Sequence, residues 1–163
     1  MTGPGYTVDH AGPADRPELE RLPDRLSGSS LLRRFHAPVR RIPAGYLDTV
    51  TAGDPTAHLS LVARSAAGEL IGLVSLNAIE RPDHRELGLL VVDGWQGRGV
   101  GSALLDEVLR SGLAAGVRLV DAVVLPELVA LLQALDRRLP RVWFHREAEA
   151  ITARYQLGSC WSS

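Results

Sequence analysis

Lysine is absent from this sequence of 163 residues, and all 18 of its basic residues are arginines. A coding bias toward GC-rich codons is the simplest explanation of this composition. The absence also has a chemical consequence, because the chain offers no lysine side chain for covalent modification.

Cysteine, net charge and long apolar segments are also scarce. The single cysteine, Cys160, has no partner for an internal disulfide. The net charge of −1 gives no bulk attraction to nucleic acid or to a membrane surface. The apolar segments are too short to span a bilayer, and residues 1–10 lack the basic start and apolar run of a signal peptide. We therefore expect a cytoplasmic protein with neither a nucleic-acid nor a membrane partner.

The length and the hydrophobic pattern indicate one domain, residues 1–163, with an α+β fold. An antiparallel meander comes first, and a strand–helix–strand–helix–strand order follows it, which predicts a mixed sheet. Pro23 is expected to kink or end the first helix, residues 27–30 to form a break, and Pro126 to begin the last helix. The predicted strands are 6–10, 58–64, 70–79, 86–92, 118–125, 141–145 and 150–157, and the predicted helices are 13–26, 31–35, 44–50, 99–113 and 128–139.

A glycine-rich turn joins the strand that ends at Val92 to the predicted helix at 99–113. Its sequence is Gln96-Gly97-Arg98-Gly99-Val100-Gly101. Glycine permits positive φ and the close approach of a ligand, and the free N–H groups of a helix's first turn favour a phosphate. Arg98 and Arg110 could add positive charge. The turn is neither a Walker loop nor a G-x-G-x-x-G dinucleotide fingerprint, and a tight turn that binds nothing is the alternative.

The segment from Glu86 to Leu105 resembles the acetyl-CoA signature of the GNAT superfamily (GCN5-related N-acetyltransferases), whose loop reads Gln/Arg-x-x-Gly-x-Gly/Ala. Gln96, Gly99 and Gly101 fill those positions. Residues 26–35 resemble the "LSxxSxxxRF" segment of a subgroup that includes bacterial protein lysine acetyltransferases. The resemblance implies a GNAT-like, mostly antiparallel mixed sheet of six to seven strands, flanked by about four helices.

The resemblance also implies where acetyl-CoA, the expected cosubstrate, would bind. Its pantetheine would lie between splayed strands at 87–92 and 118–125, and a backbone N–H near Leu90 or Val91 would polarise the thioester carbonyl. The pyrophosphate would rest on the backbone N–H groups of Gln96, Gly97, Arg98, Gly99, Val100 and Gly101, and on Ser102.

A general base must remove the proton of the acceptor amine, since a lysine ammonium has a pKa of about 10.4. Glu86 is the candidate, because it begins the strand expected to hold the thioester and has apolar neighbours. The alternative is a surface carboxylate paired with Arg85 or Arg81. His84 is a second candidate in the preceding turn, where a solvated side chain is the simpler interpretation.

Other reactive side chains are weaker candidates. His58, Asp83 and His145 are interpreted as solvated, and Cys160 is not expected to be a nucleophile. No group of His, Cys or acidic residues has metal-ligand spacing, so no metal is predicted. The helix at 128–138 lacks the tyrosine that relatives use as general acid, and Pro126-Glu127-Leu128 replaces their usual asparagine. Tyr155 could substitute only if the last strand returns to the site.

Three functions stay open on the sequence. The first is an N-acetyltransferase acting by direct attack on a protein lysine or N-terminus. The second is an enzyme acting on a small amine, for which Glu80, Asp83 and Glu86 are weak indications. The third is an acyl-CoA-binding module without catalysis. Relatives often form homodimers, so the resemblance also allows a homodimer.

Overall fold

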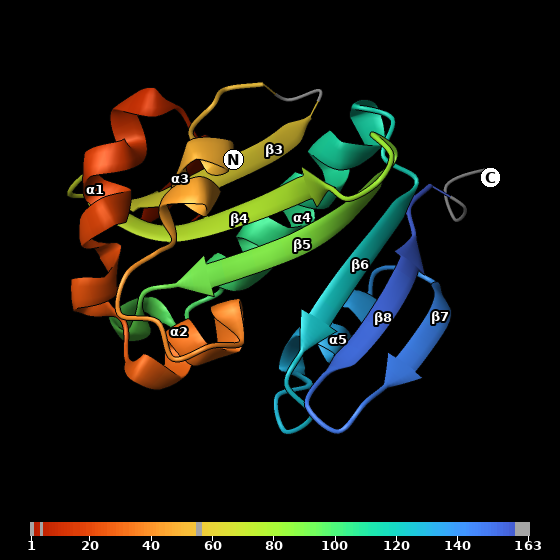
Figure 1. Ribbon diagram of the computed structural model, residues 1–163. Helices are drawn as coiled ribbons and strands as arrows, with labels where there is room; N and C mark the ends of the chain where they lie inside the picture. Colours follow the sequence, from red (N-terminus) through yellow and green to blue (C-terminus); the bar gives the residue numbers. More distant parts are fainter. Residues whose placement is uncertain (1, 4, 55–56, 159–163) are drawn as a thin grey trace.

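One mixed sheet runs through the protein. The structure is a computed structural model that describes residues 2–3, 5–54 and 57–158. Within these residues the strand order is β1-β2-β3-β4-β5-β6-β8-β7, and every neighbouring pair is antiparallel except β5 and β6 (Figure 1). The strands are β1 (Thr2–Gly3), β2 (Tyr6–His10), β3 (His58–Ser65), β4 (Leu70–Ala78), β5 (His84–Val91), β6 (Leu119–Val124), β7 (Arg141–Arg146) and β8 (Ile151–Gln156).

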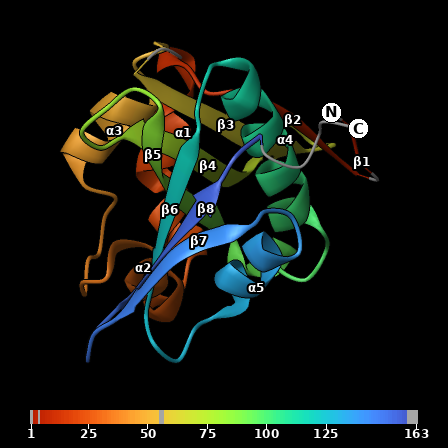
Figure 2. The same cartoon turned by 90° about the vertical axis from the view of Figure 1, so that its right-hand side faces the viewer.

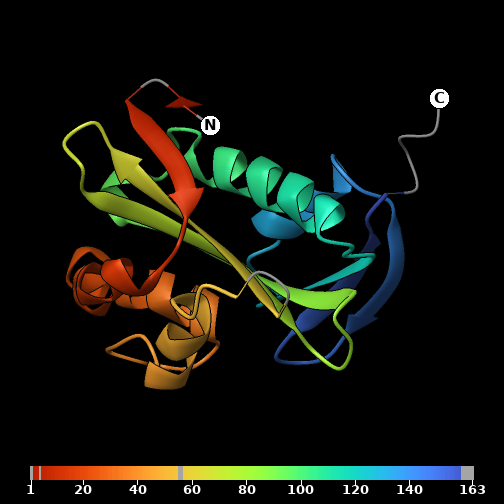
Figure 3. The same cartoon turned by 90° about the horizontal axis from the view of Figure 1, so that it is seen from above.

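Helices cover the two faces of the sheet separately. Figure 3 shows α1 to α3 on one face and α4 with α5 on the other, and Figure 2 shows the same separation from the side of β6 to β8. None of the described helices is long and apolar enough to cross a membrane. The helices are α1 (Arg16–Arg21), α2 (Gly28–Phe35), α3 (Ala44–Val50), α4 (Val100–Ala114) and α5 (Ala130–Asp136), with 3-10 turns at Pro13–Asp15, Leu22–Arg25 and Asp93–Trp95.

Each face of the sheet has its own hydrophobic core. On one face, α4 buries Leu104, Leu105 and Val108 against β2 to β6. This follows from the helical spacing of its apolar residues, which places them on one stripe. On the other face, Leu19 of α1 and Leu47 of α3 pack against β3 to β5. The core beneath α4 therefore holds the start of that helix at the end of β5.

The predicted α+β class with a mixed, mostly antiparallel sheet is confirmed. The described residues hold eight strands where six to seven were expected. The additional strand is β1, whose two residues are too few to leave a pattern in the sequence. They hold five α-helices where about four were expected. The expected effect of Pro23 is also confirmed, since α1 ends at Arg21 and a 3-10 turn follows.

Two helix boundaries were predicted wrongly. The break at 27–30 is wrong because Ser27 is the N-cap of α2, and its hydroxyl accepts a hydrogen bond from Ser30 N–H at 3.1 Å. The last helix begins at Ala130, later than predicted. Pro126 lies instead in a turn that the hydrogen bond from Leu128 N–H to Leu125 O closes at 2.9 Å.

A buried carboxylate joins β5, β6 and β8. Asp121, which is 6% exposed, accepts hydrogen bonds from Arg154 Nε at 2.7 Å and Arg154 Nη2 at 3.0 Å. His84 Nε2 lies 3.0 Å from Asp121 Oδ1. The interpretation of His84 as a solvated turn residue was therefore wrong, because it begins β5 and its side chain is mostly buried. Asp121 also faces Glu86 in the last pair of the β5–β6 ladder, so this cluster fixes the strands where their pairing ends.

We predict that Asp121→Asn lowers the free energy of unfolding by about 1.5 to 3 kcal/mol at pH 7, since charge-assisted hydrogen bonds are lost. Burial works to raise the pKa of Asp121, but the hydrogen bonds from Arg154 and the His84 imidazole beside it hold the pKa below its ordinary value. The stabilisation is therefore complete above the unfolded pKa of about 3.9 and is lost as pH falls through the lower folded pKa.

Urea denaturation of both proteins at pH 7 and at pH 3 measures this effect, and the difference between them should shrink at the lower pH. Asp83→Asn is the matched control, because the Asp83 carboxylate pairs with Arg81 on the surface and should leave the midpoint unchanged. Equal midpoints for the native and Asp121→Asn proteins at pH 7 would show that the cluster stabilises nothing.

Candidate functional site

The strands β5 and β6 separate after three paired residues. Their ladder joins His84 to Leu119, Arg85 to Val120 and Glu86 to Asp121, and then ends. Figure 1 shows the two strands diverging toward their arrowheads. A cavity of about 340 Å³ opens there, lined by Ser30, Arg33, Arg34, His36, residues 86–91, Gln96, residues 123–125, Leu128, Ala130 and Leu131.

The separation leaves one edge of β5 with unpaired backbone groups. Val92 N–H donates to Ile71 O of β4 at 2.9 Å, and alternate residues of a strand direct their backbone groups to the same side. Leu90 is paired with Leu73 in the same register, so its N–H faces β4. The N–H and carbonyl of Val91 face the open edge. Of the two residues predicted to polarise a thioester, Val91 therefore has its N–H on the side of the cavity.

The glycine-rich turn connects this open edge to the start of α4. Gly97 and Gly99 have φ of +73° and +86°, which confirms that this turn needs glycine. Gly99 is the N-cap of α4, and its carbonyl accepts the first helical bond from Ala103 N–H at 3.0 Å. The N–H groups of the residues between Gly99 and Ala103 have no helical partner. The positive end of the helix dipole can therefore meet an anion.

Gly101 differs from the other two glycines of the turn. Its φ is not positive, and a Cβ there would lie 3.7 Å from Leu89 and Val91 side chains, an ordinary contact. The protein itself could therefore accept alanine at this position.

The turn is held in place by α2, which sequence reasoning did not foresee. Asp93 accepts hydrogen bonds from Ser30 Oγ at 2.8 Å and Ser27 N–H at 3.1 Å. Partial burial works to raise the pKa of Asp93, but these hydrogen bonds hold it below its ordinary value. Gln96 Nε2 donates to Val91 O at 3.0 Å and to Ser30 Oγ at 3.2 Å. The side chain of Gln96 therefore fixes the turn against β5 and α2.

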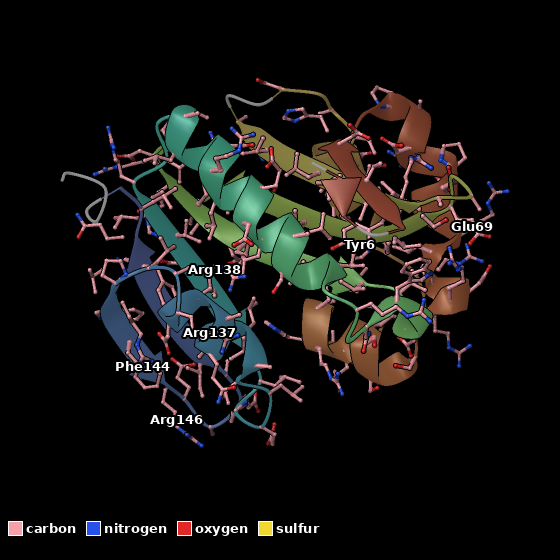
Figure 4. The ribbon with its side chains drawn as sticks, turned by 180° about the vertical axis from the view of Figure 1, so that it is seen from behind. Tyr6, Glu69, Arg137, Arg138, Phe144 and Arg146 are labelled. Atoms are coloured by element: carbon pink, nitrogen blue, oxygen red, sulfur yellow. The ribbon has the colours of Figure 1, made fainter. Side chains whose placement is uncertain are left out.

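The remaining predicted residues lie around the start of α4. The Val100 side chain is buried in the core, so only its backbone reaches the turn. The Arg98 guanidinium lies over the Trp95 ring at 4.8 Å. Ser102 Oγ accepts a hydrogen bond from Arg138 at 3.3 Å, a contact between α4 and α5 that the sequence did not indicate. Figure 4 shows Arg138 beside α4 and Tyr6 near its first turn, where Tyr6 OH donates to Gly99 O at 3.3 Å.

Glu86 lies at the point of divergence, exposed and in the cavity lining. The alternative interpretation, a carboxylate paired with Arg81 or Arg85, does not fit the structure. Arg81 pairs with Asp83, and Arg85 is buried, with its Nε donating to Pro82 O at 2.9 Å. No ion pair of Glu86 occurs among the described residues. The carboxylate is therefore available to a ligand in the cavity.

The other titratable candidates lie elsewhere. Tyr155 is buried on the α5 side, where its hydroxyl donates to Leu132 O at 3.2 Å and to Asp136 at 3.0 Å, and burial raises its pKa. His58 and His145 do not line the cavity. Arg110, considered as an added charge, pairs with Glu107. Cys160 lies outside the described residues.

These residues fit an acyl-CoA. A linear thioester arm matches the open edge of β5, and a pyrophosphate matches the unpaired N–H groups at the start of α4. Glu86, which has no ion pair among the described residues, lines the same cavity near the beginning of β5. The arrangement can bind an activated acyl group along β5 and offers a carboxylate in the same cavity as a base.

Comparison with known proteins agrees with this geometry. The chain is 29% identical over 151 residues to the acetyltransferase Pat of Mycolicibacterium smegmatis, covering 90% of this chain and 44% of that protein. It therefore spans less than half the length of this curated relative. The GNAT domain of S. lividans PAT superposes with a TM-score of 0.81 at 27% identity, over 93% of this chain and 90% of that chain. The structure of yncA from Salmonella typhimurium with its cofactor acetyl-CoA has a TM-score of 0.75 at 14% identity, over 98% of each chain, and shares the fold.

A family match spans the site itself. Residues 28–147 match the Acetyltransferase (GNAT) family. This range includes α2, the divergence of β5 from β6, the glycine-rich turn and α4, which are the parts that build the cavity. The family that the segment from Glu86 to Leu105 indicated is therefore confirmed, and the chain belongs to the acetyltransferase (GNAT) family.

Proposed function

We propose that this chain transfers an acetyl group from acetyl-CoA to the amine of a protein lysine, by direct attack within a ternary complex. The observation that carries the proposal is the opening between β5 and β6, which leads to the unpaired N–H groups of α4. The lysine acceptor is supported by the resemblance of residues 26–35 to a protein lysine acetyltransferase segment. The similarity to two proteins named Pat supports it as well.

Acetyl-CoA supplies the activated acyl group, and the chain supplies its position and the base. The N–H of Val91 would donate to the thioester oxygen as negative charge grows there. The backbone N–H groups from Gly97 to Gly101 would hold the pyrophosphate, with Ser102 beside them. The N–H of Gln96, also predicted for this role, donates instead to Asp93 O at 3.3 Å. Glu86 would accept the proton of the acceptor amine, directly or through one water.

Two variants separate the binding roles of the glycines. We predict that Gly99→Ala weakens acetyl-CoA binding at least tenfold, because φ of +86° at this N-cap is strained for a residue with a Cβ. Gly101→Ala should fold as well as the native chain, since its Cβ meets only ordinary contacts. It should also keep near-native affinity, because the loop of the resembling family carries glycine or alanine at this position.

Titration calorimetry with acetyl-CoA measures both affinities, and thermal melting shows whether each variant folds. Gly68→Ala is the matched control for Gly99→Ala, since Gly68 has φ of +83° in a turn remote from the cavity. It should lose stability and keep affinity. Native affinity in the Gly99→Ala variant would contradict the proposed pyrophosphate site.

The base is tested by Glu86→Gln, which removes the proton acceptor and keeps the shape. We predict a fall in kcat of about 100- to 10,000-fold at pH 7 with a lysine peptide, and unchanged acetyl-CoA affinity. Acetylation is read by mass spectrometry. Since the chain contains no lysine, every acetyl-lysine found must come from the acceptor. Glu69→Gln, at an exposed turn remote from the cavity, is the control. Full activity of Glu86→Gln would remove Glu86 from the mechanism.

A module that binds acyl-CoA without turnover is the second candidate. One observation favours it, because α5 contains no tyrosine and Tyr155 is packed beneath that helix. The same assay decides between the two. Acetyl-CoA binding without acetylation of lysine peptides, N-terminal peptides or polyamines would establish the binding module, and acetylation of a polyamine alone would establish a small-amine enzyme.

A further inference from the structure

The side chain of Arg34 lies directly on the backbone of β5. It extends from the last turn of α2 over Gly88, at a position that lines the cavity. A Cβ built on Gly88 would lie 2.6 Å from Arg34 Nε and closer still to the rest of the guanidinium. Glycine at 88 is therefore what allows this cation to enter the cavity.

The charge of Arg34 has no partner within the described part of the chain. No hydrogen bond or ion pair of its guanidinium occurs there, and Nε is buried without any hydrogen-bond partner. Its surroundings are aromatic, since the guanidinium lies 4.5 Å from the centre of the Tyr46 ring and 4.9 Å from that of Phe35. By contrast, Arg154 and Arg138 both pair with carboxylates.

Arg34 as a whole is half-buried, and its Nε is the atom withdrawn from water without a hydrogen-bond partner. A buried donor without a partner is costly, which favours an anion that reaches the guanidinium from the cavity. The aromatic rings orient the guanidinium and leave its donors unused. A planar guanidinium with free donors matches a carboxylate, which it can bind through two parallel hydrogen bonds.

The position of Arg34 places this anion beside the reacting groups. Gly88 and Glu86 lie on the same face of β5, two residues apart, which is about 6.6 Å along a strand. Ser75 and Asn77 of β4 face these two residues in register, and Asn77 Oδ1 is also buried without a partner among the described residues. This face of the sheet therefore carries polar groups without partners close to Glu86, where a polar ligand could bind them.

We propose that Arg34 binds a carboxylate of the substrate within a few bonds of the reacting amine or acyl carbon. The carboxylate would belong either to the acceptor, next to its amine, or to the end of a dicarboxylic acyl group on the donor. The inference rests on the proposed binding of acyl-CoA between β5 and β6. Beyond that proposed function, it identifies Arg34 as a specificity-determining residue and predicts that the substrate is negatively charged.

Matched pairs of ligands distinguish the two sources. For the donor, succinyl-CoA and butyryl-CoA have equally long acyl chains and differ in the terminal carboxylate. For the acceptor, leucine and leucinamide differ in the α-carboxylate, and lysine peptides flanked by glutamate or by glutamine differ in the neighbouring charge. Affinity for the donors is measured by calorimetry, and kcat/KM for the acceptors with acetyl-CoA.

Three variants are compared with the native chain. Arg34→Gln removes the cation, and Gly88→Ala keeps it but drives the guanidinium away from β5. Arg41→Gln removes the same charge at an exposed position outside the cavity lining. Thermal melting establishes whether each variant is folded. If Arg34→Gln does not fold, Gly88→Ala still tests the proposal.

The native chain should prefer the carboxylate-bearing member of one pair by about tenfold to a hundredfold. Both Arg34→Gln and Gly88→Ala should lose this preference, and Arg41→Gln should keep it. Equal affinity or kcat/KM of the native chain for both members of every pair would overturn the inference. An Arg34→Gln variant that lowers the affinity for all ligands equally would overturn it as well. If the native chain still binds acetyl-CoA under either outcome, the proposed function stands; if it binds no acyl-CoA, both proposals fail.

Discussion

The early end of the β5–β6 ladder is the constraint on which the site depends. A sheet normally satisfies the backbone groups of each inner strand from both sides. Here pairing stops at Glu86 and Asp121, and the remaining residues of β5 keep one edge free. The buried cluster around Asp121 makes this a fixed feature, because it holds β5, β6 and β8 together where the separation begins. A defined opening results, with rigid strands on both sides.

The helix α2 connects the opening to the rest of the site. Through Ser30, its first turn contacts Gln96 of the glycine-rich turn and Asp93 just before it, and its last turn places Arg34 over β5. One short helix thus touches both the predicted phosphate end and the predicted reacting end of the cavity. A shift of α2 would change both ends together. The N-terminal third of the chain therefore contributes residues to the site in addition to covering one face of the sheet.

The sequence was sufficient for the features that depend on local patterns. Helical spacing predicted α4, apolar segments separated by turns predicted β3 to β5, and the glycine spacing predicted a turn with positive φ at Gly99. Contacts between distant segments were out of reach. Nothing near Gly88 in the sequence indicates that a guanidinium from α2 occupies the space of its missing side chain. Asp121 did give a signal, since a lone carboxylate in an apolar strand requires a buried partner, but its partners could not be named before the order of β5, β6 and β8 was known.

The central claim is that acyl-CoA occupies the opening between β5 and β6 and ends at the start of α4. Amide hydrogen exchange of the native chain, with and without saturating acetyl-CoA, tests it most directly because it locates the ligand on the backbone. We predict slower exchange at Val91 and at residues 97–102, with β2 and β3 unchanged. Protection confined to another surface, or no protection at these amides, would contradict the account.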